Sequence, residues 1–213
     1  MIGIVDYNMG NLASVINAFA KIGVEATLES DPSKLMQYEK LILPGVGAFG
    51  DAMEHLASNG MDKAVKDYAA SGKPLLGICL GMQLLFESSE EFAKDSNGTK
   101  GLGLIPGKVV AFDESKFDHS LKVPHMGWNE TFQIKNEELG IRNDLFDGLP
   151  EDFYLYFVHS YHAVCDDKYA IGKTHYGYEF VSAVQNDNIY GIQPHPEKSH
   201  EHGLQIIENF AKL

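Results

Sequence analysis

The first half of the chain alternates short runs of Ile, Leu and Val with longer stretches in which apolar residues recur every three or four positions. The short runs predict buried strands, and they lie at 2–5, 26–28, 41–43 and 74–78. The longer stretches, at 12–22 and between 49 and 72, have the period of amphipathic helices. Strands that alternate with helices in this order are typical of an α/β protein with a parallel sheet.

Turn-forming residues mark where the predicted helices begin and end. Asn11 is a residue type that caps helix N-termini, and Gly23 suits the end of the helix that follows it. Gly60 separates two helical segments, and Gly72 ends the second of them. The sequence therefore predicts one helix after the first strand and two helices before the strand at 74–78.

The second half has a different pattern, in which β-type segments follow one another. Residues with high strand propensity lie around 109–112, 128–134 and 153–158. The segments 178–184 and 189–193 flank a QNDN turn and predict a hairpin, and residues 204–213 have the pattern of an amphipathic helix. We expect these strands to extend the first sheet. The predicted fold is one domain, residues 1–213, with a mixed, largely parallel central sheet flanked by helices.

Composition and charge narrow the classes of function. With 44% hydrophobic and 22% charged residues among 213, the chain has the composition of a globular protein. It contains no apolar run of the roughly 18 residues that a membrane span needs, and MIGIVDYNMGN lacks the basic segment of a signal peptide, so we expect a cytoplasmic protein. Because 30 acidic residues outnumber 17 basic ones, giving a formal charge of −13, nucleic-acid binding is disfavoured.

One of the two cysteines lies in an unusual setting. In PLLGICLGMQLLF, Cys79 follows a predicted strand and has Gly77 and Gly81 on either side. This G-x-C-x-G has the layout of a nucleophile elbow, whose small flanking residues allow a sharp turn that exposes the nucleophile. A helix N-terminus behind it would favour the thiolate, and the free amide of Leu80 would point to where an oxyanion forms. The alternative is a small buried cysteine, as we expect for Cys165.

A thiol nucleophile needs a base, and the sequence context favours one histidine among nine. His195 directly follows a predicted strand in GIQPHPEKS, where prolines restrict the backbone on both sides. Glu197 lies two residues further on and would orient the imidazole ring. His159 and His162 are three positions apart on a predicted strand, so we expect them to face opposite sides of it.

Two other classes of function fit parts of the sequence. Residues 45–50 form G-x-G-x-x-G after a strand and before a helix, which is the spacing of a dinucleotide-binding loop. The acidic residue that should end the next strand is missing, because that strand ends in Cys79. A non-catalytic binding module with a structural cysteine is the second alternative. No ligand spacing predicts a metal site, and His200 and His202 are expected to be solvated.

The motifs LPGVGAF, GICLGMQLL and QPHPEKS follow one another in this order along the chain. Together they resemble the class I glutamine amidotransferases over nearly the whole chain. The resemblance implies a flavodoxin-like fold and an enzyme without a cofactor that releases ammonia from L-glutamine through a cysteine thioester. PGVGAFGDAM, KVPHMGWN, FVHSY and IVDYNMGNL are similar to one branch of the family, whose partner is a (β/α)8-barrel cyclase of histidine biosynthesis. Branches that serve anthranilate, purine or nucleotide-sugar synthases are the alternative.

The resemblance also implies roles for individual residues. The implied catalytic set is Cys79 as nucleophile, His195 as base and Glu197 as the residue that orients it. The implied oxyanion donors are amides of Leu80, Val46 and Gly47. The implied glutamine-binding set is Gln83, Glu91, Tyr156, His159 and Ser160. The implied docking set for the cyclase is Asn8, Asn11, Pro124, Met126 and Trp128, although core packing explains Trp128 equally well on the residues alone.

Overall fold

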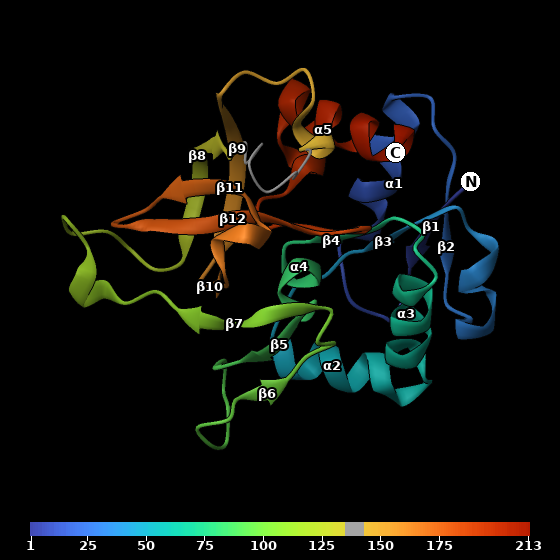
Figure 1. Ribbon diagram of the computed structural model, residues 1–213, viewed down its shortest axis with the longest axis horizontal. Coiled ribbons are helices and arrows are strands. Elements are labelled where there is room, and N and C mark those ends of the chain that lie inside the picture. Colours follow the sequence, from blue (N-terminus) through green and yellow to red (C-terminus); the bar gives the residue numbers. More distant parts are fainter. Residues whose placement is uncertain (135–142) are drawn as a thin grey trace.

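The computed structural model describes residues 1–134 and 143–213, and the strands in these ranges join one continuous sheet (Figure 1). Its parallel part has the order β2 (Ala26–Glu29), β1 (Ile2–Val5), β3 (Lys40–Leu43), β4 (Leu75–Ile78) and β13 (Ile189–Ile192). The carboxyl ends of β4 and β13 lie side by side, with Ile78 opposite Ile192. Residues that follow these two strands therefore meet at the same edge of the sheet.

The rest of the sheet is mainly antiparallel. Beyond β13 its order is β12 (Glu179–Asn186), β10 (Tyr161–Val164), β7 (Ile105–Ala111), β5 (Phe86–Ser89) and β6 (Thr99–Lys100). A branch from β12 runs through β11 (Ala170–His175) and β8 (His125–Gln133) to β9 (Asp152–His159). The strands β8 and β9 form a long antiparallel pair. The residues that follow β13 contact β9, since the N–H of His195 donates to Tyr156 O.

Helices cover both faces of the parallel strands. In Figure 1, α1 (Leu12–Lys21) and α5 (His200–Lys212) lie on one face, and α2 (Phe49–Ser58) and α3 (Met61–Ala70) lie on the other. The short helix α4 (Leu80–Leu84) follows β4. Short 3-10 helices complete the described elements, at η1 (Pro32–Gln37), η2 (Glu114–Lys116), η4 (Asp144–Phe146), η5 (Asp167–Tyr169) and η6 (Pro196–Lys198).

Two hydrophobic cores follow from the alternation of side chains along the strands. On β3, Leu41 and Leu43 pack beneath α2 and α3, whereas Ile42 packs beneath α1 and α5. The α2/α3 core also contains Phe49, Leu56, Val65 and Tyr68, and the α1/α5 core also contains Phe19, Ile206, Ile207 and Phe210. A buried strand with apolar residues on both faces supplies both cores, which is why the parallel strands appear in the sequence as uninterrupted apolar runs.

Most of the predicted elements are confirmed. The strands of the first half, the helices on both sides of Gly60, and the hairpin of β12 and β13 are all present. Gly60 and Gly72 have φ angles of 80° and 81°, the left-handed region in which glycine is favoured. The later strands extend the first sheet, as expected.

Some local predictions were wrong or incomplete. Asn11 occupies the N-cap position of α1, but its side chain makes no capping hydrogen bond. The last helix begins at His200 rather than at residue 204. The strands β5, β6 and β11 were not predicted, because each is short and lacks a clear alternation of apolar and polar residues. The strand β10 was expected only as a continuation of the strand that contains His159.

Candidate active site

Cys79 stands at a sharp turn between β4 and α4. Its φ of 54° and ψ of −112° are unusual for a residue with a side chain, and such a conformation costs about 1–3 kcal/mol. Its N–H donates to Ile192 O at 2.8 Å, which fastens the turn to β13. The flanking glycines have no room for a side chain, since a Cβ on Gly81 would lie 1.8 Å from Leu43 O and one on Gly77 would lie 2.6 Å from Gly81 O. The G-x-C-x-G spacing is therefore a packing requirement of this elbow.

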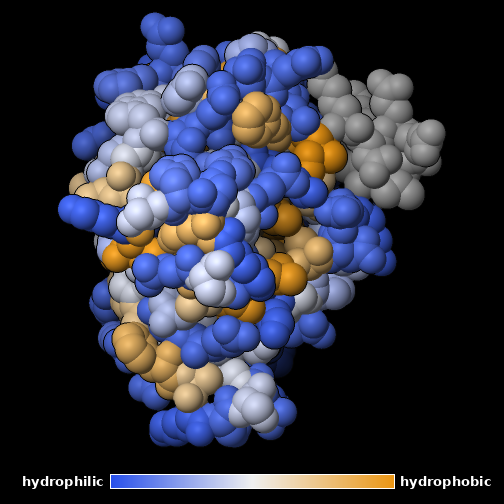
Figure 2. All heavy atoms as spheres, turned by 90° about the vertical axis from the view of Figure 1, so that its left-hand side faces the viewer, coloured by the Kyte–Doolittle hydropathy of each residue, from blue (hydrophilic) through white to orange (hydrophobic). Residues whose placement is uncertain are grey.

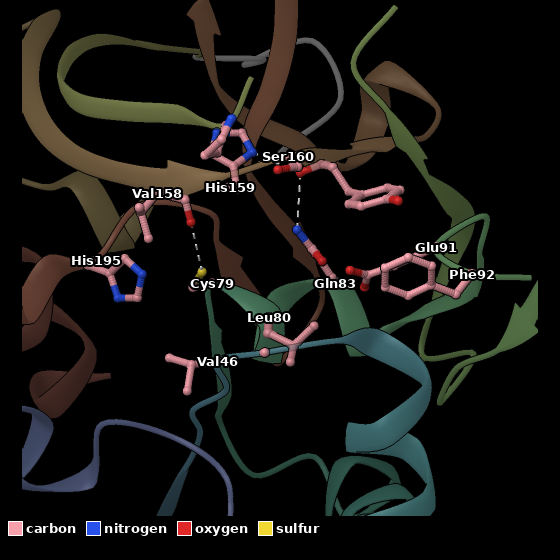
Figure 3. A pocket seen from close by; sticks show the side chains of 13 residues that line it. Val46, Cys79, Leu80, Gln83, Glu91, Phe92, Val158, His159, Ser160 and His195 are labelled. Atoms are coloured by element: carbon pink, nitrogen blue, oxygen red, sulfur yellow. Dashed lines mark hydrogen bonds between the residues drawn. The ribbon is translucent and has the colours of Figure 1, made fainter. Parts of the chain in front are cut away.

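The Cys79 side chain borders a cavity of about 420 Å³ (Figure 3). Most of the predicted site residues line it, namely Val46, Gly47, Cys79, Leu80, Gln83, Glu91, Pro124, His159, Ser160 and His195. Phe92 and Tyr161 also line it and were not predicted, and Val158 lines it from within the segment 156–160, which was expected to contact the substrate. A cavity of this size, with several convergent polar groups, is suited to a small polar molecule.

His195 and Glu197 form a buried pair beside Cys79. Nδ1 of His195 lies 2.8 Å from Oε1 of Glu197, and the two side chains are only 3% and 2% exposed. Nε2 of His195 has no hydrogen-bond partner among the described residues, and Figure 3 shows the imidazole ring beside the sulfur of Cys79. Burial by itself lowers the pKa of His195, but the negative charge of the neighbouring Cys79 and Glu197, together with the hydrogen bond to Glu197, outweighs it and raises that pKa to about 10. The imidazole of His195 is therefore placed to exchange a proton with the Cys79 thiol.

The loop that carries His195 is fastened to β9. The backbone N–H of His195 donates to Tyr156 O at 2.8 Å. Ser199 Oγ donates to His195 O at 2.6 Å and accepts from the backbone N–H of Tyr156 at 2.9 Å. Tyr156 does not line the cavity, so in this structure it contributes to the site through its backbone. No sequence pattern signalled this clamp, because it depends on which strand lies beside η6.

The segment Pro44 to Gly47 faces Cys79 from the other side of the cavity. Tyr7 is buried beneath it and donates its hydroxyl to Pro44 O at 2.8 Å. Burial, together with the charge of Cys79, raises the pKa of Tyr7, so the hydroxyl keeps its proton and remains a donor. Gly47 has a φ of 98°, which favours glycine, and Val46 is 40% exposed at the cavity rim. The loop is thus anchored at its start and open at Val46 and Gly47.

Glu91 lies where the loop at residues 45–50 would bind a dinucleotide if its G-x-G-x-x-G spacing had that function. Its Oε2 accepts from the backbone N–H of Phe49 at 2.7 Å, at the N-terminus of α2. The pKa of Glu91 is raised above its ordinary value, mainly by burial and to a smaller extent by the charge of Asp51, although the hydrogen bond from the Phe49 amide partly offsets this rise. A carboxylate therefore occupies the place where a dinucleotide-binding loop would hold a pyrophosphate, which argues against that alternative.

His159 lines the cavity, but both of its ring nitrogens are already engaged. Nδ1 lies 2.8 Å from Tyr161 O, and Nε2 lies 2.9 Å from Nδ1 of His125. A carbonyl oxygen only accepts, so Nδ1 of His159 carries its proton and Nε2 accepts from His125. Burial lowers the pKa of both imidazoles, that of His125 to about 4. His159 is therefore a neutral wall residue and not a competing base.

The expectation that His159 and His162 face opposite sides of one strand is wrong. The strand is interrupted at Ser160, with β9 ending at His159 and β10 beginning at Tyr161. Both rings instead contact Phe112, at centroid distances of 5.2 and 4.9 Å. The break resets the alternation of side chains, which the sequence pattern could not reveal.

The outer face of β8 carries exposed apolar side chains next to the cavity. Met126 is 63% exposed and Trp128 is 46% exposed, so Trp128 is not a core residue. Trp128 stacks on His200 at 5.0 Å, and Tyr156 lies beside it on β9. Figure 2 views the molecule from the side of β7, β8 and β12 and shows a mainly hydrophilic face interrupted by hydrophobic groups. Asn8 and Asn11, in the loop before α1, are exposed as well.

The remaining predictions concern groups outside the cavity. Cys165 is partly buried, and burial together with Asp167 and Asp166 raises its pKa to about 11, which suits a structural thiol. Within residues 1–134 and 143–213, no group of three or more His, Cys, Asp or Glu side chains is placed to hold a metal ion. No helix in these ranges is long and apolar enough to cross a membrane.

Comparisons with known proteins agree with this geometry. The family model for class I glutamine amidotransferases matches residues 3–213. The chain is 68% identical to imidazole glycerol phosphate synthase subunit HisH of Sulfurimonas denitrificans, over all of this chain and 98% of that one. It is 54% identical to the subunit of the same name from Wolinella succinogenes, over the full length of both. The solved structure of PurLQS from Thermotoga maritima has a TM-score of 0.75 at 20% identity, covering 99% of this chain and 97% of that one, and shares the fold.

Proposed function

We propose that this chain, which belongs to the class I glutamine amidotransferase family, is the glutaminase subunit of an imidazole glycerol phosphate synthase. It would work in the cytoplasm and pass ammonia to a (β/α)8-barrel cyclase that makes imidazole glycerol phosphate and AICAR. The observation that carries the proposal is the elbow cysteine beside a buried, carboxylate-held imidazole at the wall of a small cavity. The names of the full-length relatives support the choice of synthase.

The first half of the proposed reaction forms a thioester. The Cys79 thiolate attacks the side-chain amide carbon of glutamine, and the carbonyl oxygen becomes an oxyanion that the amides of Leu80 and of Val46 or Gly47 hold. When the oxyanion collapses, the carbon–nitrogen bond breaks and protonated His195 gives its proton to the departing nitrogen. Ammonia leaves, and the glutamyl group remains on sulfur. Gln83, Glu91 and Ser160 line the cavity and would hold the rest of the substrate.

The second half releases glutamate. Neutral His195 takes a proton from water, the resulting hydroxide attacks the thioester carbonyl, and the carbon–sulfur bond breaks to return the thiolate. Glu197 keeps Nδ1 of the ring protonated and supports the imidazolium in both halves. The sum of the two halves is glutamine and water giving glutamate and ammonia. The exposed face of β8, which borders the cavity, is where the cyclase would dock to receive the ammonia.

The test compares wild type with Cys79→Ala in complex with the cyclase. Cys79→Ala should abolish glutamate release from glutamine, whereas synthesis from added ammonium salts should continue, because the acceptor chemistry belongs to the other protein. Cys165→Ala is the matched control and should retain glutamine-dependent synthesis. Wild type without the cyclase should release glutamate slowly, because we expect the amides of Val46 and Gly47 to turn toward the oxyanion only when the cyclase is bound. Full glutamine turnover by Cys79→Ala would refute the assignment.

A further inference from the structure

Gln193 is a fully buried polar side chain that the proposed chemistry does not use. It directly follows β13, and its backbone N–H donates to Ser182 O at 2.8 Å, which ties it to β12. None of its surface is exposed. A buried amide without partners would cost about 1–3 kcal/mol, so the contacts of this side chain determine whether it belongs there.

Those contacts form a chain of hydrogen bonds with a single direction. Nε2 of Gln83 lies 3.1 Å from Tyr161 O and 2.9 Å from Oε1 of Gln193. Because a backbone carbonyl only accepts, Tyr161 requires Gln83 to turn its NH2 group this way. Oε1 of Gln193 then accepts from Gln83, and Nε2 of Gln193 is left to donate to Sγ of Cys79 at 3.7 Å.

We propose that Gln193 is a further residue of the glutaminase reaction, whose side-chain amide donates to the Cys79 sulfur, stabilises the thiolate and holds it at the cavity wall. The identity of the reaction rests on the proposed function, whereas the hydrogen-bond chain needs neither glutamine nor a partner protein. A hydrogen bond to a charged acceptor is roughly twice as strong as one to a neutral acceptor. Gln193 therefore favours the thiolate over the thiol.

Gln193 can donate a hydrogen bond to the Cys79 sulfur at every stage of the reaction, whereas His195 cannot. His195 gives its proton to the departing ammonia, and so it is neutral while the thioester exists. It regains a proton only when water attacks. The amide of Gln193 transfers no proton, so its donor is present whenever negative charge leaves or returns to the sulfur. Its direction is fixed from a distance by Tyr161 O through Gln83.

The proposal is tested by the reactivity of the thiol alone. In a Cys165→Ala background, the rate of alkylation by iodoacetamide is measured against pH without glutamine or cyclase. Gln193→Met keeps the length of the side chain but removes the donor, and should raise the midpoint of the alkylation profile by about one to two pH units. Gln133→Met is the matched control, because that amide donates to Leu149 O at 2.9 Å, away from the cavity, and the midpoint should stay in place.

Two further variants test the direction of the chain. Gln193→Glu places a carboxylate at the sulfur and should raise the midpoint further, because like charges repel. Gln83→Met frees Gln193 to rotate and should give a smaller rise than Gln193→Met.

An unchanged midpoint in Gln193→Met with a wild-type circular dichroism spectrum would overturn the proposal. If Gln193→Met does not fold, unchanged midpoints in both other variants would overturn it, and raised midpoints would support it. A chain that shows these shifts but never hydrolyses glutamine with the cyclase would keep the role of Gln193 at the thiolate and refute the proposed function instead.

Discussion

Among the histidines near the cavity, His195 differs from His159 because its Nε2 atom is available to accept or donate a proton. Both nitrogens of His159 are engaged, whereas Nε2 of His195 has no partner among the described residues and lies beside Cys79. Glu197 holds the other nitrogen of His195. The base and the wall residue are thus separated by their hydrogen bonds rather than by their distance from the cavity.

The roles of His195 and Glu197 lead to different losses when each is changed. His195→Ala should lower the rate of glutamate release by about 10²- to 10⁴-fold, the usual contribution of a general base. Glu197→Gln should lose less, because the amide can still orient the ring although it no longer supports the imidazolium. Initial rates of glutamate release in the complex measure both. A His195→Ala variant with near-normal turnover would mean that another group is the base.

The raised pKa of His195 also predicts how stability depends on pH. Protonated His195 is favoured in the folded state, so its contribution to the free energy of unfolding is full below the ordinary pKa of 6.5 and is lost as the pH rises through about 10. Glu197→Gln removes one cause of the raised pKa. The difference in free energy of unfolding between wild type and Glu197→Gln should therefore be largest near about pH 6 and shrink toward about pH 10. Urea titrations across this range measure it, and a difference that grows with pH would contradict the ion pair.

The residues that the sequence could indicate were those with a local pattern. Cys79 is flanked by glycines that the elbow cannot replace, and His195 and Glu197 share one short motif. Gln193 lies in the same motif but carries no such signal, because a glutamine at the end of a strand is ordinary in sequence. Its role depends on the direction of an amide, which only the positions of Gln83 and Tyr161 determine.

Among the structural elements, the contact between α4 and β3 sets the elbow and yields a stability prediction. Gly81→Ala would place a Cβ 1.8 Å from Leu43 O, so a strand or the helix must move, and we expect a loss of about 3 kcal/mol in the free energy of unfolding. Gly50→Ala in α2 is the control, since the nearest atom to its Cβ is 3.9 Å away. It should leave stability unchanged or raise it by up to about 1 kcal/mol. Urea titrations compare the two, and equal stabilities would show that the elbow tolerates a side chain.

The exposed face of β8 gives a prediction about the cyclase. Trp128→Ala should weaken the complex by about 1–4 kcal/mol, the range for an aromatic anchor in an interface, with little change in the stability of the isolated chain because Trp128 is 46% exposed. Leu28→Ala is the control, because Leu28 is also exposed but lies on β2 at the opposite end of the sheet. Titration calorimetry against the cyclase measures both. Equal affinity of Trp128→Ala and wild type would remove Trp128 from the docking set.

Elements were predictable where several apolar residues formed an uninterrupted run or recurred with the period of a helix. The runs that became β1, β3 and β4, and the helical segments around Gly60, met this condition. The break at Ser160 did not, since a single residue between β9 and β10 leaves no mark on composition. The placement of His159 and His162 on one aromatic cluster therefore required the structure.

For the whole molecule, the continuous sheet supports our proposal that residues 1–213 form one domain. The two cores share strands, so neither can melt without exposing the other, and we expect one cooperative unfolding transition. The single tryptophan, Trp128, reports on the antiparallel branch, whereas far-UV circular dichroism reports mainly on the helices beside the parallel strands. The two signals should have the same thermal midpoint. Two separate midpoints would divide the chain into two domains.

At this scale the sequence indicated the layers but not the branching of the sheet. Helix and strand order predicted parallel strands between helices, and the turn at QNDN predicted the pairing of β12 with β13. Nothing local predicted that β11, β8 and β9 would leave the main path of the sheet at β12. That branch depends on pairing between segments far apart in the chain, and it supplies the wall that completes the cavity.

The elbow has one more consequence, which concerns the handling of the protein. Cys79 packs in the α1/α5 core and its neighbour Leu80 packs in the α2/α3 core, so one peptide bond crosses from one layer to the other. Cys79 does not lie on a flexible loop, so a change in the packing of either core would displace its sulfur. Activity on storage should therefore be lost at the same rate as the native fold. An ammonia assay would then measure the folded fraction of a preparation.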